Sequence, residues 1–209
     1  MRSGERIPPT RIELIRARRE LARVLKGTDL LRRKREALVG ELFRLARPAV
    51  DARTAIAAHV NEAGPPLLRA LAVHGGPALR AMSWPARELT VELAPGQVWG
   101  IPVSNIVRKP PVRRTLDARA LAPGSAGPAA AETARRFEML VDLLLDAAPR
   151  EQRIRRLGDA LAHTTRHVRT LEQRIAPALR DRIARVRRTL EEREREEHLR
   201  LKHVQRRRK

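Results

Sequence analysis

The sequence predicts an all-α protein in which two long helices pair as an antiparallel coiled coil, with a small irregular or β-hairpin head between them. Two observations favour this fold class. Apolar residues recur at heptad spacing in both halves of the 209-residue chain, and aromatic residues make up only 2% of it, too few for a compact core of ordinary size. We therefore expect a first helix in residues 1–64, a head with a flexible loop in residues 65–130, and a second helix with an overhanging basic end in residues 131–209.

The first helix is expected to begin at a capping box, in which the side chains of Thr10 and Glu13 each bond to the other's backbone amide. Behind this box, apolar positions recur every seven residues, and the row comprises Ala17, Val24, Leu31, Leu38, Leu45 and Ala52. Such a row is typical of a coiled-coil seam. We expect Pro48 to kink or shorten the helix and Gly64-Pro65-Pro66 to end it near residue 62.

The second helix is expected to begin after Gly127-Pro128, because proline suits the first turn of a helix. Its apolar row steps by three and four residues through Ile154, Leu157, Leu161, Thr164, Val168, Leu171 and Ile175. The step from Ile175 to Leu179 is four residues again, and such a stutter locally unwinds a left-handed supercoil. Pro177 lies in the same stretch, so two independent features predict an irregular turn. We assign the coiled-coil seam to Val24, Leu31, Leu38, Leu45, Ile154, Leu157, Leu161, Val168, Leu171 and Ile175.

The region between the two helices contains two segments with the pattern of short strands. Residues 88–93 alternate as a half-buried strand does. Residues 98–107 offer a second strand, in which Pro102 is compatible only with an edge position. We therefore expect a β-hairpin in the head, followed by a flexible loop over residues 118–131, where alanine, glycine and proline dominate.

The second helix is expected to be longer than the first, so about twenty residues at its end should extend past the first helix. Ion pairs at i,i+4 spacing, such as Glu191 with Arg195, stabilise a helix by roughly 0.2–0.5 kcal/mol each, which does not hold it in water. We therefore expect a second molecule to enclose this end, with contacts from Arg195, Arg200, Leu201, Lys202 and Arg206.

The formal net charge of +21 indicates an anionic partner, which is a nucleic acid, an anionic membrane surface or an acidic protein cavity. Basic runs at residues 32–35 and 206–209 have the charge to bind phosphates. The sequence lacks the interleaved aromatic residues and the recognition-helix pattern that accompany nucleic-acid binding. A basic coiled-coil protein that binds nucleic acid or scaffolds other chains nevertheless stays the alternative interpretation.

The sequence contains no motif for catalysis. It has no glycine-rich phosphate loop, no nucleophile motif and no cysteine. His163 and His167 have the i,i+4 spacing of zinc ligands, but Thr164 stands where zincins need a glutamate, which favours surface residues beside the seam. We therefore expect neither enzymatic activity nor a cofactor or metal. With no signal peptide and no apolar run of membrane-spanning length, we also expect a soluble cytoplasmic protein.

Five stretches of the chain together resemble one known family. They are PTRIEL at residues 9–14, KGTDLLRRKREALV at 26–39, VWGIPV at 98–103, TTRHVRTLE at 164–172 with its following Pro177, and EREREEHLRLK at 192–202. In this combination and order, they resemble the D subunit of V-type and A-type ATPases, the central rotor shaft of these complexes. The resemblance spans both predicted helices and the head.

The resemblance implies a non-catalytic shaft that couples ATP synthesis or hydrolysis to ion transport, with protons expected as the ion. It implies that the helical termini contact a ring of catalytic and regulatory subunits, that the small F subunit binds the shaft, and that the head meets the funnel-shaped subunit on the membrane rotor ring. It also implies a peripheral position at the inner face of the cell membrane, with no insertion of this chain. Synthesis and hydrolysis, and protons and sodium ions, stay open alternatives.

Overall fold

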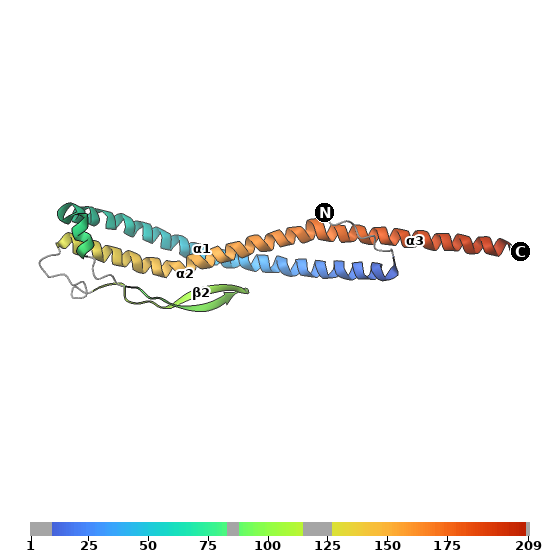
Figure 1. The fold of residues 1–209 in the computed structure, drawn as a ribbon, viewed down its shortest axis with the longest axis horizontal. Coiled ribbons are helices and arrows are strands. Elements are labelled where there is room, and N and C mark those ends of the chain that lie inside the picture. The colour runs from blue at the N-terminus through green and yellow to red at the C-terminus, as the bar shows by residue number, and fades with distance from the viewer. Residues whose placement is uncertain (1–9, 83–87, 115–126, 208–209) are drawn as a thin grey trace. The chain divides into compact units, whose positions relative to one another are not determined.

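The computed structural model of the chain describes residues 10–82, 88–114 and 127–207. Two long helical runs, with a two-stranded antiparallel sheet between them in the sequence, confirm the predicted fold class (Figure 1). Contacts divide the chain into unit 1, residues 1–36 and 161–209, and unit 2, residues 37–160. The elements are α1 (Arg11–Met82), β1 (Glu92–Val98), β2 (Ile101–Arg108), α2 (Pro128–Thr170), the π-helix η2 (Leu171–Ile175) and α3 (Ala176–Arg207).

Ion pairs show that the two helical runs of unit 1 are antiparallel. Arg11 at the start of α1 reaches Glu194 (2.7 Å), whereas Arg32, further along α1, reaches Glu172 (2.6 Å). Residues from both runs are buried in this unit, which indicates where its core lies. They are Glu13, Ala17, Thr28, Thr164, Val168, Ala176 and Leu179.

The start of α1 forms half of the predicted capping box. The Thr10 hydroxyl accepts a hydrogen bond from the Glu13 amide (3.2 Å), and the Thr10 carbonyl accepts one from Leu14 (3.1 Å). The Glu13 carboxylate accepts a hydrogen bond from Arg182 of α3, a partner that the sequence did not predict, and its bond to the Thr10 amide stays a prediction. A carboxylate that is largely buried gains more from a guanidinium than from a neutral backbone amide.

The predicted irregular turn is present as the π-helix η2. The Ala176 amide donates to the Leu171 carbonyl, five residues back, so this turn holds one residue more than an α-helical turn. Pro177 follows directly; it has no amide proton to donate, and in an α-helix its ring clashes with the carbonyl four residues back. The additional residue changes which side chains face the core. Ala176 and Leu179 are buried, while Ile175, predicted to lie in the seam, is 38% exposed.

Unit 2 also contains antiparallel helices. Arg53 of α1 pairs with Glu151 of α2 (2.6 Å), and Glu62, later in α1, pairs with the earlier residue Arg136 (2.5 Å). Pro48 lies inside α1 without ending it. The core of this unit combines a few large side chains with several alanines, and its apolar members are Leu38, Leu45, Ala49, Ala63, Ala70, Ile101, Val103, Val112, Ala130, Ala147 and Leu157.

The predicted end of the first helix near residue 62 is wrong, because α1 continues through Gly64-Pro65-Pro66 to Met82. The two prolines release the carbonyls of Asn61 and Glu62, but both residues are exposed, so water can satisfy those carbonyls. Ala63 and Ala70, on either side of the prolines, are almost completely buried. The backbone departs from helical geometry further on, at Gly75, where φ is 72° and glycine is the residue that adopts it readily.

The head contains the predicted β-hairpin, but its first strand lies elsewhere than predicted. β1 spans Glu92–Val98 and not residues 88–93, because a two-residue turn sets the register by pairing Val98 with Ile101. The turn residues Trp99 and Gly100 have φ values of 53° and 76°, as a type I′ turn requires. The left-handed conformation costs a residue with a side chain roughly 1–2 kcal/mol. The hairpin buries Ile101 and Val103 on one face.

The start of α2 agrees with the prediction from proline. The Gly127 carbonyl accepts hydrogen bonds from the amides of Ala130 (3.0 Å) and Ala131 (3.3 Å), with Pro128 in the first turn, where no amide proton is needed. Of the predicted flexible loop, residues 118–126 lie outside the described residues, and residues 128–131 are helical. Within the described parts of the chain, no helix has the length and apolar character of a membrane span.

Candidate functional site

The predicted seam residues are distributed over both units and differ in burial. In unit 2, Leu38, Leu45 and Leu157 are buried, and Ile154 is half-buried. In unit 1, Val168 is buried, and Val24, Leu31, Leu161 and Leu171 are half-buried. The apolar row therefore corresponds to a line of reduced exposure along both helical runs, apart from Ile175 at the π-helix. Such a line stiffens a helix pair, because bending has to separate packed side chains.

The end of α3 beyond this line is fully exposed. Every residue from 192 to 207 is exposed, and we call this segment the exposed end. Figure 1 shows it continuing past the start of α1, where the Arg11–Glu194 ion pair lies. Its apolar side chains, Leu199, Leu201 and Val204, are each at least half exposed. The predicted contact residues Arg195, Arg200, Leu201, Lys202 and Arg206 all belong to this segment.

The polar contacts at the base of the exposed end differ from the prediction. Glu191 was expected to pair with Arg195, but its carboxylate contacts Arg187 (2.7 Å), one turn back. Arg195 instead donates to the backbone carbonyl of Glu191 (3.3 Å). Both arrangements use i,i+4 neighbours, between which sequence spacing does not choose. Contacts of this kind are local and leave the outer surface of the segment available to another molecule.

The hairpin is fastened to α2 by polar contacts along β2. Near the turn, the Arg156 guanidinium donates a hydrogen bond to the Pro102 carbonyl (3.0 Å). Further along the strand, Arg153 donates to the side-chain oxygen of Asn105 (2.6 Å). As β2 advances, its partners on α2 come from earlier in that helix, so strand and helix are antiparallel here.

A third fastening lies one residue beyond β2. The Lys109 ammonium is 2.8 Å from the Asp142 carboxylate and 2.7 Å from that of Asp146, and these hydrogen bonds raise the pKa of Lys109. Sequence reasoning missed all three fastenings. The only signal for them was helical spacing, which places Asp142 with Asp146, and Arg153 with Arg156, on one side of a helix. Together the contacts fix the position of the hairpin on α2.

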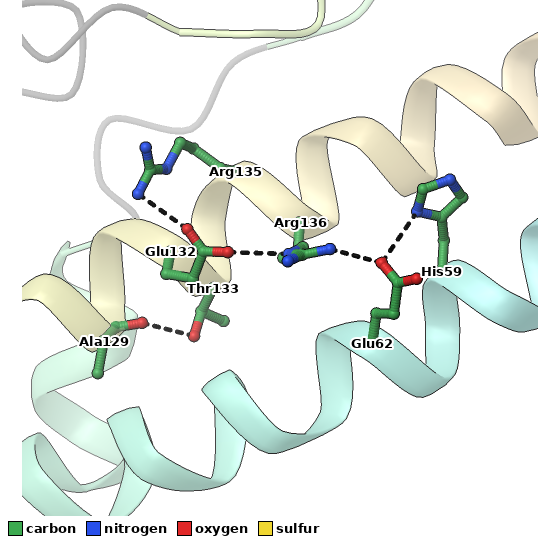
Figure 2. Close-up of polar contacts among 7 residues, drawn as sticks. All are labelled: His59, Glu62, Ala129, Glu132, Thr133, Arg135 and Arg136. Atoms are coloured by element: carbon green, nitrogen blue, oxygen red, sulfur yellow. Dashed lines mark hydrogen bonds and ion pairs between the residues drawn. The ribbon is translucent and has the colours of Figure 1, made fainter.

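An ion-pair network joins α1 to α2 in unit 2 (Figure 2). The Arg136 guanidinium lies between two carboxylates, 2.5 Å from Glu62 on α1 and 2.8 Å from Glu132 on its own helix. Arg135 also contacts Glu132 (2.8 Å), and His59 lies 3.8 Å from Glu62. The hydrogen bond from Arg136 is the main cause that lowers the pKa of Glu132. The Arg136–Glu62 pair links the two helices and favours one register between them.

The histidine pair considered as a metal site lies on the surface. His163 and His167 are both exposed, with ring centroids 4.2 Å apart and the rings tilted by 47°. Across residues 10–82, 88–114 and 127–207, no group of three or more histidine or acidic side chains is placed to hold a metal ion. The features that the structure offers for function are therefore surfaces: the exposed end, the hairpin, and the helix pair that carries them.

Comparison with known proteins decides between the two interpretations of these surfaces. A family model that describes the D subunit of ATP synthase matches residues 13–206, a range that includes both helical runs, the hairpin and nearly all of the exposed end. The chain belongs to the ATP synthase D-subunit family. The D subunit is a non-catalytic stalk component of V-type and A-type ATP synthases, so membership supports the stalk interpretation over the nucleic-acid-binding alternative.

Individual relatives agree with the family assignment. The V-type ATP synthase D subunit of Anaeromyxobacter sp. (strain Fw109-5) is 37% identical over 97% of this chain and 94% of its own length. The V-type ATP synthase D subunit of Thermus thermophilus is 36% identical over 95% of this chain and 87% of its own. The A-type ATP synthase D subunit of Methanosarcina mazei is 33% identical over 95% of each. The similarity therefore extends along nearly the whole chain and includes D subunits of both V-type and A-type ATP synthases.

Proposed function

We propose that this chain is the central rotor shaft of a V/A-type ATP synthase and carries torque between a catalytic ring and a membrane rotor. The observation that carries the proposal is the exposed end: a helix of sixteen residues, 192–207, without a buried side chain. A helix of this length has marginal stability alone in water, because its nucleation is costly. Enclosure by a ring of subunits would supply the packing that the segment lacks within this chain.

The side chains of the exposed end suit a bearing that turns. Leu199, Leu201 and Val204 offer a thin apolar surface, and basic residues such as Lys202 and Arg206 surround it. Cationic side chains on long flexible stems are able to exchange partners among acidic groups or carbonyls as the helix rotates. We therefore assign this end to the bore of the ring of catalytic and regulatory subunits.

The helix pair suits the transmission of torque. Ion pairs in each unit join the two helical runs, as with Arg32–Glu172 in unit 1 and Arg53–Glu151 in unit 2. They resist sliding of one helix along the other, while the buried side chains resist separation. We assign the side of the helix pair to the F subunit and the head to the funnel-shaped subunit of the membrane rotor ring. In this arrangement the chain is peripheral at the inner face of the membrane, and the transported ion is the proton.

The proposal is tested by purifying the chain with an affinity tag from native membranes and identifying the proteins that accompany it. We expect the catalytic and regulatory ring subunits and the F subunit in stoichiometric amounts. Reconstituted ring subunits should couple ATP hydrolysis to rotation only when the chain is present. Recovery of nucleic acid in place of these subunits, with binding that falls steeply as salt rises, would contradict the proposal.

A further inference from the structure

Trp99 occupies a backbone position that tryptophan seldom takes. It is the first of the two turn residues between β1 and β2, and its φ of 53° lies in the left-handed region. Among the residues that the structure describes, it is the only one other than glycine with a positive φ. Asn, Asp and Gly take this turn position at lower conformational cost, so the turn does not account for tryptophan. An unfavourable conformation kept at a surface position is a reason to look for a function.

The packing of the hairpin does not account for Trp99 either. Its side chain is 59% exposed, whereas Ile101 and Val103 form the buried face of the hairpin. The fastenings to α2 come from Pro102, Asn105 and Lys109, and none of them involves the indole. This tryptophan neither favours the turn nor fills the core. Its large exposed apolar surface therefore does not stabilise the fold.

The turn presents this indole from a rigid support. A two-residue loop has few conformations that keep the strand register, and the Arg156–Pro102 hydrogen bond holds the strand to α2 three residues from Trp99. A side chain on a rigid backbone loses only its own rotamer freedom when it binds, because the loop itself needs no ordering. Tryptophan is also among the residue types most enriched at the energetic centres of protein interfaces.

The surroundings of Trp99 indicate the kind of partner. Arg156 brings positive charge beside the turn, and Arg155, also exposed, precedes it on α2. The residues next to the turn on the outward face, Gln97 and Pro102, carry no charge and are exposed. We infer that Trp99 anchors the hairpin in an apolar pocket with an acidic rim on another protein subunit of the ATP synthase. The inference rests on the proposed function, since it takes the partner from that complex.

A protein pocket fits these observations better than a membrane surface. Stable membrane binding requires a broad apolar face or two separate anchoring signals, and the turn offers a single indole with two arginines nearby, which is neither a broad apolar face nor a polybasic patch. A lipid interface also tolerates many orientations and does not select a strained, rigid turn. A shaped pocket does select one, because its fit depends on the direction of the ring.

The first experiment replaces Trp99 with residues that leave the turn intact. Trp99→Asn places a preferred residue at the turn and removes the indole, so the hairpin is expected to keep its amide hydrogen-exchange protection. Trp99→Gly gives a second such variant, and Trp99→Phe keeps a ring. The matched control is Val107→Ala, because Val107 is a 68% exposed apolar residue at the other end of the same hairpin. Each full-length variant is titrated into the chain's own ATP synthase complex reconstituted without this subunit.

We expect Trp99→Asn and Trp99→Gly to bind about 30-fold more weakly, a loss of affinity typical for removal of a side chain at the energetic centre of an interface. The affinities of Trp99→Phe and Val107→Ala should stay within about threefold of that of the original chain. Equal affinity of Trp99→Asn and the original chain would overturn the inference. So would a loss in Val107→Ala as large as that in Trp99→Asn, because the effect would then not belong to the indole.

The second experiment locates the partner directly. A photo-crosslinking p-benzoylphenylalanine at position 99 should form a covalent adduct with one subunit in the assembled complex, and the same group at position 107 should not. Vesicles of phosphatidylglycerol and phosphatidylcholine provide the membrane arm, and binding that depends on Trp99 would overturn the inference in favour of lipid. If the chain enters the complex but position 99 forms no adduct, the inference fails alone. If the chain does not enter the complex, the proposed function fails first.

Discussion

Two stretches of the C-terminal helical run contrast in what supports them. The paired stretch, residues 161–191, buries Thr164, Val168, Ala176 and Leu179 and exchanges ion pairs with α1. The exposed end, residues 192–207, continues as the same helix without a buried side chain. Apart from the π-helix η2 in the paired stretch, both stretches are α-helical, and charged residues are frequent in both. The main difference between them is what packs against them.

The contrast shows that helical structure in this chain has two different origins. In the paired stretch, packing of an apolar face stabilises the helix, as is usual in proteins. In the exposed end, the chain supplies intrinsic propensity, local i,i+4 contacts such as Arg195 with the Glu191 carbonyl, and the solvent-exposed ion pair of Glu194 with Arg11. A sequence that keeps strong helix formers where nothing packs is therefore adapted to a surface outside itself. Substitutions in the two stretches should separate folding from function.

The largest effect on stability is expected from charge in the core of the paired stretch. Val168→Asp places a carboxylate at a site that is 1% exposed, which should lower the free energy of unfolding by at least about 3 kcal/mol. Leu201→Asp, in the exposed end, should change it by less than about 0.5 kcal/mol. The measurement is urea unfolding followed by circular dichroism.

Leu161 provides an intermediate point in the same series. It is half-buried, so Leu161→Asp leaves its carboxylate partly in contact with water and should destabilise the chain less than Val168→Asp does. Similar unfolding curves for Val168→Asp and the original chain would show that the paired stretch is not held by this core.

The second prediction removes the exposed end itself. Ending the chain after Glu191 deletes no buried side chain, so the unfolding midpoint of the remaining helix pair should stay nearly unchanged. ATP-driven rotation of the reconstituted complex should be severely reduced, because the segment assigned to the bore is missing. The control is a chain whose residues 192–207 are replaced by a helix of equal length made of two repeats of four Glu followed by four Lys, which places opposite charges at i,i+4. Full rotation by the truncated chain would exclude a bearing role for this segment.

The parts of the fold that follow from short-range periodicity were predictable from the sequence. Heptad spacing corresponds directly to burial, as at Leu38 and Leu157, because the period of the pattern is nearly the period of the helix. The start of α2 followed from Pro128. Each of these inferences needs only the chain's own geometry.

The features that were predicted wrongly or missed depend on contacts between residues that are distant in the sequence. The break signal at Gly64-Pro65-Pro66 is local, and burial of Ala63 and Ala70 outweighs it. The position of β1 depends on the left-handed backbone conformation of residue 99, and a tryptophan at this position does not predict that conformation. The fastenings of the hairpin, such as Arg153 with Asn105, join residues far apart in the sequence. A single sequence carries no signal for such pairs beyond spacing on one element.

The third prediction concerns the π-helix inside the paired stretch and asks whether Pro177 or the packing maintains it. Pro177→Ala restores an amide proton, which should stabilise the chain by at most about 1 kcal/mol, because the ring clashes in an α-helix and not in the π-helix that is present. We expect the π-helix to persist, because converting it to an α-helix would rotate Ala176 and Leu179 out of the core. Amide hydrogen exchange over residues 171–178 provides the measurement. Exposure of Leu179 in the variant would show instead that proline alone fixes the turn.

The smallest expected effect comes from two of the ion pairs of α1, one with the paired stretch and one with the first turn of the exposed end. Glu172 is about one-third exposed, and Arg32 meets it with two nitrogens, at 2.7 and 2.6 Å. Arg11 and Glu194 make a single contact at 2.7 Å and are 80% and 56% exposed.

A double-mutant cycle of Arg32→Gln and Glu172→Gln should give a coupling of about 0.5 kcal/mol that weakens in high salt. The cycle of Arg11→Gln and Glu194→Gln should give a coupling near zero, because solvent screens both charges and ordering two long side chains costs entropy. Couplings of equal size would mean that α1 supports the helix as firmly at Glu194 as at Glu172, and the boundary between the two stretches would then lie beyond Glu194.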